Sequence, residues 1–211
     1  MTSNERNHGV FLKRFHTVKN LFSSQECDRI VEYFDKSVST RASVVNFEES
    51  KDNKVIGMVA EDIRDGRIVF CDHKNQYMNF AFQKLYYASI WANFGWSLFP
   101  LRYLQIAKYD VNDSGGFYKR HRDIIIDLKP QRILSCVIQL SAKEDYTGCD
   151  LVFDAESNAP LQEDYCNRGD AIFFTSTEPH EVTPILTGKR YSLTAWFEGP
   201  TIWNDESEYN V

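Results

Sequence analysis

Two histidines and an aspartate could form a metal site. His121 and Asp123 stand two positions apart in the segment FYKRHRDI, and His180 follows much later, directly after Pro179. Alternate residues of a β-strand face the same side, so this segment would direct both of its ligands one way and Arg122 the other. Two histidines and one carboxylate leave coordination positions open, as in the non-haem Fe(II) sites that react with oxygen. The spacing therefore predicts a metal triad of these three residues.

An arginine and a serine downstream could hold an anion. In the segment KRYSLTAW, strand alternation places four side chains on one face: Arg190, Ser192, Thr194 and Trp196. An arginine directed into an aromatic-rich interior needs an anionic partner, and its planar guanidinium suits a carboxylate. The serine hydroxyl can donate a further hydrogen bond to the same group. The sequence thus predicts a small dicarboxylate that reaches Arg190 and Ser192 at one end and the metal at the other.

Helical patterns occupy the first half of the chain. The segment SSQECDRIVEYF carries a capping box, Ser23 with Glu26, followed by apolar residues at helical spacing. An apolar and aromatic stretch over 75–93 predicts a second helix that ends before Gly95. Between them, residues 38–70 mix strand-like runs with a charged loop, EESKDNK, to which the sequence assigns no role. We expect both helices to cover one face of a sheet.

From residue 98 onward the patterns are those of strands and turns. The strand-like runs are LRYLQIAKY, FYKRHRDI, RILSCVIQL, DLVF, AIFF, HEVTPI and RYSLTAWF. Helices followed by short strands predict an α+β, mainly β fold, an antiparallel sandwich or barrel backed by helices. We expect a single domain over 1–211, with helical support and variable loops at about 1–97, a strand core at about 98–199 and a polar tail at 204–211.

Composition limits the classes of function. The net charge of −6 and the pI near 5.4 give no long-range attraction to nucleic acid or to an anionic membrane. No apolar run could span a bilayer, and MTSNERNHGV lacks the apolar core of a secretory signal peptide, so we expect a soluble, cytoplasmic protein. The five cysteines form no CxxC pair, and we expect buried, reduced thiols without chemistry. The sequence does not indicate an oligomeric state.

These motifs resemble the HxD…H…RxS signature of the Fe(II)/2-oxoglutarate dioxygenase superfamily. The segments LQIAKYDVNDSGGFYKRHRD and GDAIFFTSTEPHEVTPILTGKRYSLTAWFEGP are similar to its prolyl 4-hydroxylase-like branch, which includes the bacterial PKHD-type hydroxylases. The resemblance implies a double-stranded β-helix core (jelly-roll, cupin-like) with N-terminal helices behind it. The implied Fe(II) ligands are His121, Asp123 and His180. It also implies that Arg190 holds the distal carboxylate of 2-oxoglutarate, assisted by Ser192 and Tyr109.

The resemblance further implies a hydroxylase. It would oxidise an unactivated C–H with O₂, while 2-oxoglutarate is decarboxylated to succinate and CO₂, with ascorbate as a reductant. The implied substrate is a prolyl residue of a peptide or protein, and the alternative is a free amino acid or other small molecule. Arg132 and Trp196 are candidates for substrate contacts.

Three details bear on the choice among relatives. Halogenating relatives lack the carboxylate that Asp123 supplies, so its presence favours hydroxylation. Trp196 stands where nucleic-acid-demethylating relatives typically carry a second arginine, which argues against nucleobase repair. In YTGCDL, Cys149 replaces a glycine of the branch, and we expect the turn to be altered without an effect on the site.

Two other classes of function are compatible with parts of the pattern. One is a non-catalytic binding module that uses the cavity or residues 38–70 for a partner. The other is a zinc-dependent hydrolase on the same triad, which needs a general base near the metal. Glu181 is the one adjacent candidate, and strand alternation directs it away from His180.

Overall fold

The computed structural model describes residues 13–45, 57–113, 116–125 and 129–200. The charged loop EESKDNK and the tail at 204–211 lie outside these described residues. The helices and strands in chain order are β1 (Phe15–Val18), α1 (Ser24–Lys36), β2 (Thr40–Arg41), β3 (Val44–Val45), β4 (Gly57–Met58), β5 (Arg64–Asp65), β6 (Arg67–Asp72), α2 (Asn79–Ala92), β7 (Tyr103–Asp110), β8 (Phe117–His121), β9 (Gln131–Gln139), β10 (Tyr146–Gly148), β11 (Leu151–Phe153), β12 (Ala171–Thr175), β13 (His180–Val182) and β14 (Ile185–Gly199).

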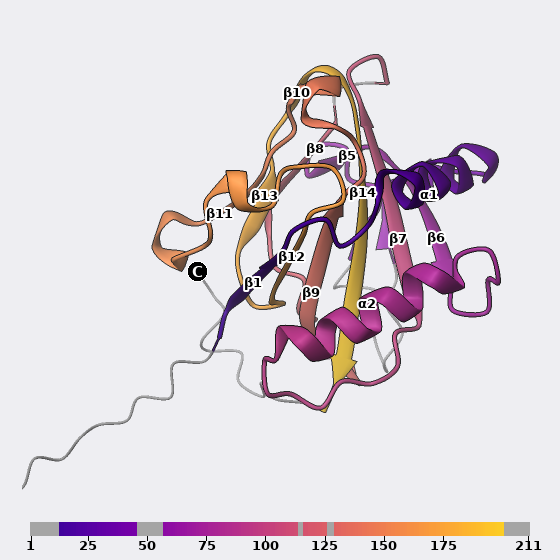
Figure 1. The fold of residues 1–211 in the computed structure, drawn as a ribbon. Helices are drawn as coiled ribbons and strands as arrows, with labels where there is room; N and C mark the ends of the chain where they lie inside the picture. Colours follow the sequence, from indigo (N-terminus) through magenta and orange to yellow (C-terminus); the bar gives the residue numbers. More distant parts are fainter. Residues whose placement is uncertain (1–12, 46–56, 114–115, 126–128, 201–211) are drawn as a thin grey trace, which may run out of the picture.

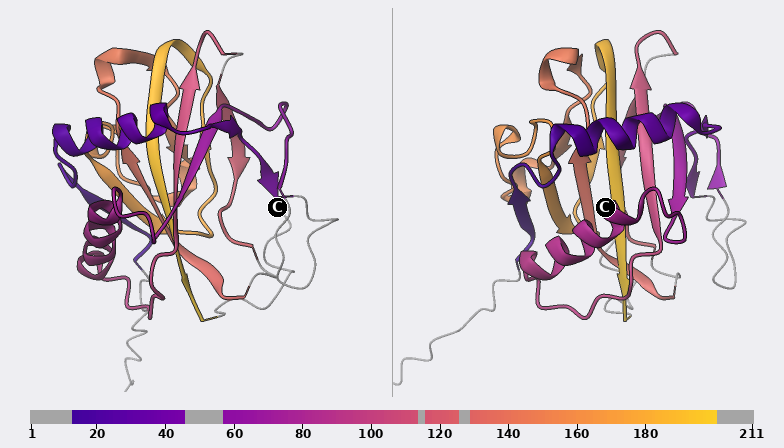
Figure 2. Two further views of the ribbon diagram at one scale, coloured as in Figure 1. Left: turned by 90° about the vertical axis from the view of Figure 1, so that its right-hand side faces the viewer. Right: turned by 45° about the vertical axis from the view of Figure 1, so that its right-hand side comes forward.

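Two antiparallel sheets form the body of the protein (Figure 1). The larger sheet has the strand order β1-β12-β9-β14-β7-β6-β2, and β10 pairs with β14 beside this path. The smaller sheet has the order β11-β13-β8-β5. Figure 2 shows both helices on one side of the larger sheet and the smaller sheet on its other side. This arrangement confirms the predicted mainly β, jelly-roll fold with N-terminal helices behind it.

The first helix begins where its capping box predicts. The Ser23 hydroxyl accepts from the backbone N–H of Glu26, and the Glu26 carboxylate accepts from the backbone N–H of Ser23. The second helix begins at Asn79, later than predicted, because the side chain of Asn75 accepts from the backbone N–H of Met78 and forms a turn there. It ends at Ala92.

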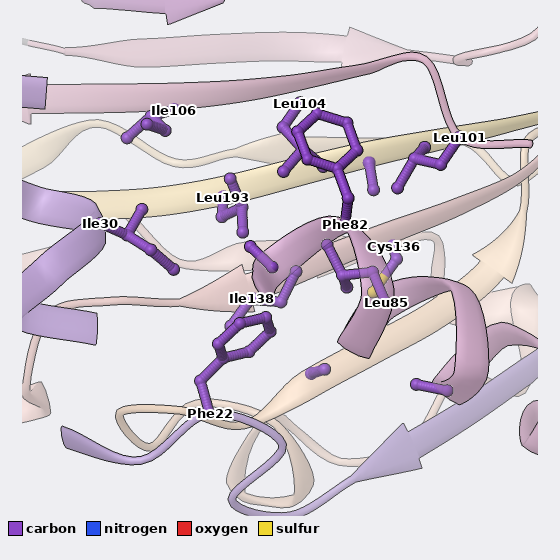
Figure 3. Packing of buried hydrophobic residues seen from close by; sticks show 14 of the residues in the cluster. Phe22, Ile30, Phe82, Leu85, Leu101, Leu104, Ile106, Cys136, Ile138 and Leu193 are labelled. Atoms are coloured by element: carbon purple, nitrogen blue, oxygen red, sulfur yellow. The ribbon is translucent and has the colours of Figure 1, made fainter. Parts of the chain in front are cut away.

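Alternate residues of the larger sheet enter two different cores. One face packs against the helices, where Ile106, Cys136 and Leu193 meet Ile30 and Leu85 (Figure 3). The neighbouring residues on the same strands face the smaller sheet, and they include Ala107, Val137, Ile172 and Phe174. The period of two in the sequence therefore separates a helix-covered face from the face that lines the site.

Residues before position 98 supply strands as well as helices. β1, β2 and β6 extend the larger sheet, and β5 forms an edge of the smaller one. β5 is short, but its pairing with β8 brings Arg64 opposite Tyr118, beside the metal triad described below. Neither α1 nor α2, the two α-helices of the described ranges, is long and apolar enough to cross a membrane.

Candidate active site

His121 and His180 are brought together by the pairing of β8 with β13. They stand directly opposite each other in the register, and their ring centroids are 4.3 Å apart. Each Nδ1 lies 2.9 Å from a backbone carbonyl oxygen, that of Lys119 for His121 and that of Glu178 for His180. Because a carbonyl oxygen can only accept, both Nδ1 atoms carry the proton, and both Nε2 atoms are left with a lone pair for a metal.

Asp123 reaches the two histidines from beyond the end of β8. The strand ends at His121, so the predicted strand alternation is wrong at Asp123. Its position is set instead by the backbone N–H groups of Asp123 and Ile124, which both donate to the carbonyl oxygen of Ser176 at 3.0 Å. Its Oδ1 lies 3.7 Å from Nε2 of His121, and its Oδ2 lies 3.7 Å from Nε2 of His180. The three candidate ligand atoms all lie within 4.8 Å of one another.

The protonation state of this triad suits a divalent cation. Burial disfavours the charged form of Asp123, but His180 and His121 hold the pKa of its carboxyl well below the usual range. Burial, with a further contribution from His121, lowers the pKa of His180 to about 4. Near neutral pH the site therefore offers a carboxylate and a neutral imidazole, the forms that bind metals. The Asp123 Oδ2 is also buried without a hydrogen-bond partner, as a ligand atom would be.

Arg190, on β14, is a buried cation in the wall of the same cavity. Its side chain is 1% exposed, and its Nε and NH2 groups donate to Oε1 of Gln139 at 2.9 and 2.8 Å. Burial opposes its charge, but Cys149 and the tyrosines Tyr146 and Tyr109 raise the pKa of Arg190 above its ordinary value. None of the ion pairs between described residues includes Arg190. A buried guanidinium without a carboxylate needs an anion from outside the protein.

Tyr109 and Ser192 flank this arginine. Tyr109 stands opposite Arg190 in the pairing of β7 with β14, and its ring centroid is 5.9 Å from the guanidinium carbon. Burial raises the pKa of Tyr109, so its hydroxyl stays protonated. Gly116 leaves room for it, because a Cβ there would lie 2.9 Å from the Cβ of Tyr109. Ser192 lies two residues along β14 and lines the same cavity.

A cavity of about 540 Å³ between the two sheets connects the triad with the arginine. Its lining includes all four side chains of the predicted face, which are Arg190, Ser192, Thr194 and Trp196. His180 and Val182 also line it, whereas Glu181 between them does not, as alternation predicts. Arg122 lines it too, so the expectation that this residue faces away is wrong; its Nε donates to the carbonyl oxygen of Thr177.

Residues 104–198, which carry the triad and Arg190, match the family model of the 2OG-Fe(II) oxygenase superfamily. A PKHD-type hydroxylase of Acinetobacter baylyi is 33% identical over 94 residues, which cover 43% of this chain and 40% of that protein. These matches support the 2OG-Fe(II) oxygenase superfamily and its prolyl 4-hydroxylase-like branch for this part of the chain. The predicted resemblance is thereby confirmed.

Solved structures share this oxygenase fold. A prolyl-4-hydroxylase of Pseudomonas putida has a TM-score of 0.61 at 21% identity, over 88% of this chain and 92% of that chain. A prolyl hydroxylase from Trichoplax adhaerens, in complex with a peptide fragment of the hypoxia inducible factor oxygen degradation domain, has a TM-score of 0.59 at 19% identity, over 92% and 85%. The chain spans less than half the length of the curated relatives that it matches.

Cys149 differs from the expectation drawn from the sequence. It lies in the left-handed region with φ 53°, directly after Gly148 with φ 69°, so the turn keeps a conformation that favours glycine. Its buried Sγ lies 4.0 Å from NH1 of Arg190. The expectation that this substitution leaves the site unaffected is therefore wrong, because the thiol contacts the guanidinium directly.

The sequence did not predict two residues that lie in or beside this cavity. Gln139 is the last residue of β9, and a polar residue at the end of the apolar run RILSCVIQL is the signal that could have found it. Arg64 lines the cavity from β5, a two-residue strand without a recognisable pattern. Of the predicted substrate residues, Arg132 and Trp196 both line the cavity, with the Arg132 guanidinium carbon 4.3 Å from the Trp196 ring centroid.

Proposed function

We propose that this protein is an Fe(II)- and 2-oxoglutarate-dependent hydroxylase. The observation that carries the proposal is one cavity that joins a three-ligand site to Arg190, a buried cation without an ion pair to any described residue. The three ligands are His121, Asp123 and His180. The substrate that we propose is a prolyl residue of a peptide or protein, and the alternative is a free amino acid or other small molecule. The prolyl 4-hydroxylase-like relatives support a prolyl substrate. Ascorbate belongs to the proposal as a reductant.

The protein groups have separate roles in this proposal. The triad residues His121, Asp123 and His180 would hold Fe(II), and bound iron with 2-oxoglutarate and O₂ would supply the oxidation of a C–H to a C–OH. Arg190 would bind the distal carboxylate of 2-oxoglutarate through the N–H groups that do not donate to Gln139, with Ser192 donating a further hydrogen bond. The protonated hydroxyl of Tyr109 would be a further donor beside Arg190. The two sheets would keep the cavity dry and direct the target C–H toward the metal side.

The loaded wild-type protein tests this function directly. Under anaerobic conditions, Fe(II) and 2-oxoglutarate together should give a visible charge-transfer band that neither gives alone. Admission of O₂ should then convert 2-oxoglutarate to succinate, measured by mass spectrometry. The absence of both the band and succinate would overturn the proposal. Zinc bound in place of iron, with hydrolase activity and no succinate, would support the zinc-dependent class, although no described carboxylate besides Asp123 lines the cavity.

A Gln139→Leu variant tests the arrangement of the arginine. Gln139 accepts two hydrogen bonds from Arg190 and so fixes the plane of the guanidinium. Loss of hydrogen bonds to a charged group costs about 1.5–3 kcal/mol, so we expect the dissociation constant for 2-oxoglutarate to rise roughly 10-fold or more. Titration of the charge-transfer band measures it. Fe(II) affinity should not change, and Gln83→Leu on the exposed side of α2 is the matched control. Unchanged 2-oxoglutarate affinity would contradict the positioning role of Gln139.

A further inference from the structure

Besides Arg190 and Arg122, two arginines line the cavity without a role in the proposed chemistry. Arg64 reaches it from β5 on the smaller sheet, and Arg132 reaches it from β9 on the larger sheet. Among the described lining residues, the charged side chains are four arginines and one carboxylate, Asp123. The described lining therefore carries an excess of positive charge, although the net charge of the chain is −6. Because this positive charge is local to the cavity, we expect the cavity to bind a ligand that carries an anionic group.

Arg64 is fixed close to the metal triad. It stands opposite Tyr118 in the pairing of β5 with β8, and its guanidinium carbon is 4.5 Å from the Tyr118 ring centroid. That ring stacks on His121 with a centroid distance of 3.5 Å and an interplanar angle of 17°. One aromatic ring thus separates Arg64 from a predicted metal ligand. The side chain of Arg64 is 6% exposed, NH1 donates to the carbonyl oxygen of Ser43, and Nε is buried without an acceptor.

Among the described residues, Arg132 is held by stacking on Trp196. Its guanidinium lies over the Trp196 ring, and it makes no hydrogen bond or ion pair with any described residue. Burial lowers the pKa of Arg132 from its ordinary value, while Asp123 and Glu198 act in the opposite direction. Glu198 is already paired with Arg102. The donors of Arg132 are therefore available to a ligand in the cavity.

The proposed cofactors leave these two arginines without a counter-charge. In the proposed loaded site, the charges of Fe(II), Asp123, 2-oxoglutarate and Arg190 cancel one another. Arg64 and Arg132 would then remain buried or half-buried without a counter-ion, which costs free energy unless the next ligand brings one.

We propose that the substrate of this site carries a carboxylate that binds Arg64 and Arg132 while the adjacent C–H is oxidised. This inference rests on the proposed hydroxylase function and names the chemical class of its substrate. The carboxylate can belong to a free acid, such as an amino acid, or to an aspartate or glutamate side chain beside a prolyl residue. Both sources offer the same planar group to a guanidinium fork.

Matched substrates give the first test. The Fe(II)-loaded protein, with 2-oxoglutarate and O₂, is given two sets of acid–amide pairs. The first set pairs free amino acids with their carboxamides. The second set pairs prolyl peptides that have aspartate or glutamate next to proline with the same peptides carrying asparagine or glutamine there. Succinate release and a mass gain of one oxygen are measured for each compound. We expect the acid of at least one pair to have a kcat/KM roughly 30-fold or more above that of its amide. The pair that responds identifies the source of the carboxylate.

Variants of the two arginines give the second test. In Arg64→Met and Arg132→Met, kcat/KM for the acid should fall by about 30-fold or more, while that for the amide and the KM for 2-oxoglutarate should change little. Arg64→Lys and Arg132→Lys keep the charge and should recover part of the loss. Arg29→Met on α1, which contacts Tyr77 and Phe80 outside the cavity, is the control for the substitution itself.

Three results would overturn the carboxylate inference. They are equal turnover of acid and amide, an equal loss for both in the methionine variants, and no stimulation of succinate release by any acid in the panel. In each case the charge-transfer band and substrate-free succinate formation of the wild type show whether the hydroxylase function stands. Loss of the band in the wild type would instead refute the function on which the inference rests.

Discussion

An Asp123→Ala variant is expected to lose Fe(II) binding and, with it, all metal-dependent succinate formation. Asp123 would be the one anionic ligand beside two neutral imidazoles, and its Oδ2 has no other partner. Changes to the partners of metal ligands commonly cost roughly 10–100-fold in affinity, so loss of the ligand itself should exceed ~100-fold. Anaerobic calorimetric titration with Fe(II) measures this change, and the charge-transfer band should be absent from the variant.

The control for this variant removes an equivalent charge elsewhere. Asp28 pairs with Arg168 at the surface, and Asp28→Ala should keep the Fe(II) affinity of the wild type. Thermal unfolding separates loss of the ligand from loss of the fold. Metal at 100 times its dissociation constant should stabilise the wild type by about 2.7 kcal/mol and leave Asp123→Ala unaffected. If Asp123→Ala binds Fe(II) as tightly as the wild type, the metal site is not this triad.

An Arg190→Met variant is expected to lose most of its affinity for 2-oxoglutarate. Arg190 is the one buried guanidinium on the predicted face of β14. Removal of one partner of a buried charge pair costs about 2–5 kcal/mol, so the dissociation constant for 2-oxoglutarate should rise roughly 30-fold or more. The triad ligands come from β8, β13 and the residues just after β8, so Fe(II) affinity should not change. Anaerobic titration of the charge-transfer band gives the dissociation constant.

The neighbour of Arg190 requires a second variant. In Arg190→Met, Gln139 loses both of its donors, and a buried unsatisfied acceptor costs about 1–3 kcal/mol of stability. The double variant Gln139→Leu/Arg190→Met removes that acceptor and should recover stability without recovering 2-oxoglutarate affinity. Arg190→Lys should be intermediate, because lysine keeps the charge but not the planar fork. Wild-type affinity in Arg190→Met would refute the role assigned to this arginine.

Local patterns in the sequence predicted much of the fold correctly. The capping box at Ser23 and Glu26 placed the start of α1 because its two hydrogen bonds join residues only three apart. The alternation in KRYSLTAW placed Arg190 and Trp196 on the cavity face because β14 is a regular strand through this segment. The start of α2 was less accurate, since a side-chain turn at Asn75 competes with the helix there.

Contacts between distant segments could not be predicted from local patterns. Asp123 is positioned by the carbonyl oxygen of Ser176, and Cys149 lies against Arg190. Arg64 enters the cavity because β5 pairs with β8. Each of these depends on two segments far apart in the chain, whose approach leaves no periodic signal in either one.

The sequence by itself determined which residue types are available: two histidines and a carboxylate for a metal, and an arginine and a serine on one strand face for an anion. The resemblance to the oxygenase superfamily rested on the same residues. Only the tertiary structure decided how they meet. β13 and β14 are consecutive in the chain, yet β13 belongs to the smaller sheet and β14 to the larger one. His180 and Arg190 therefore line one cavity from two sheets, because the chain crosses between the sheets within the few residues that separate these strands.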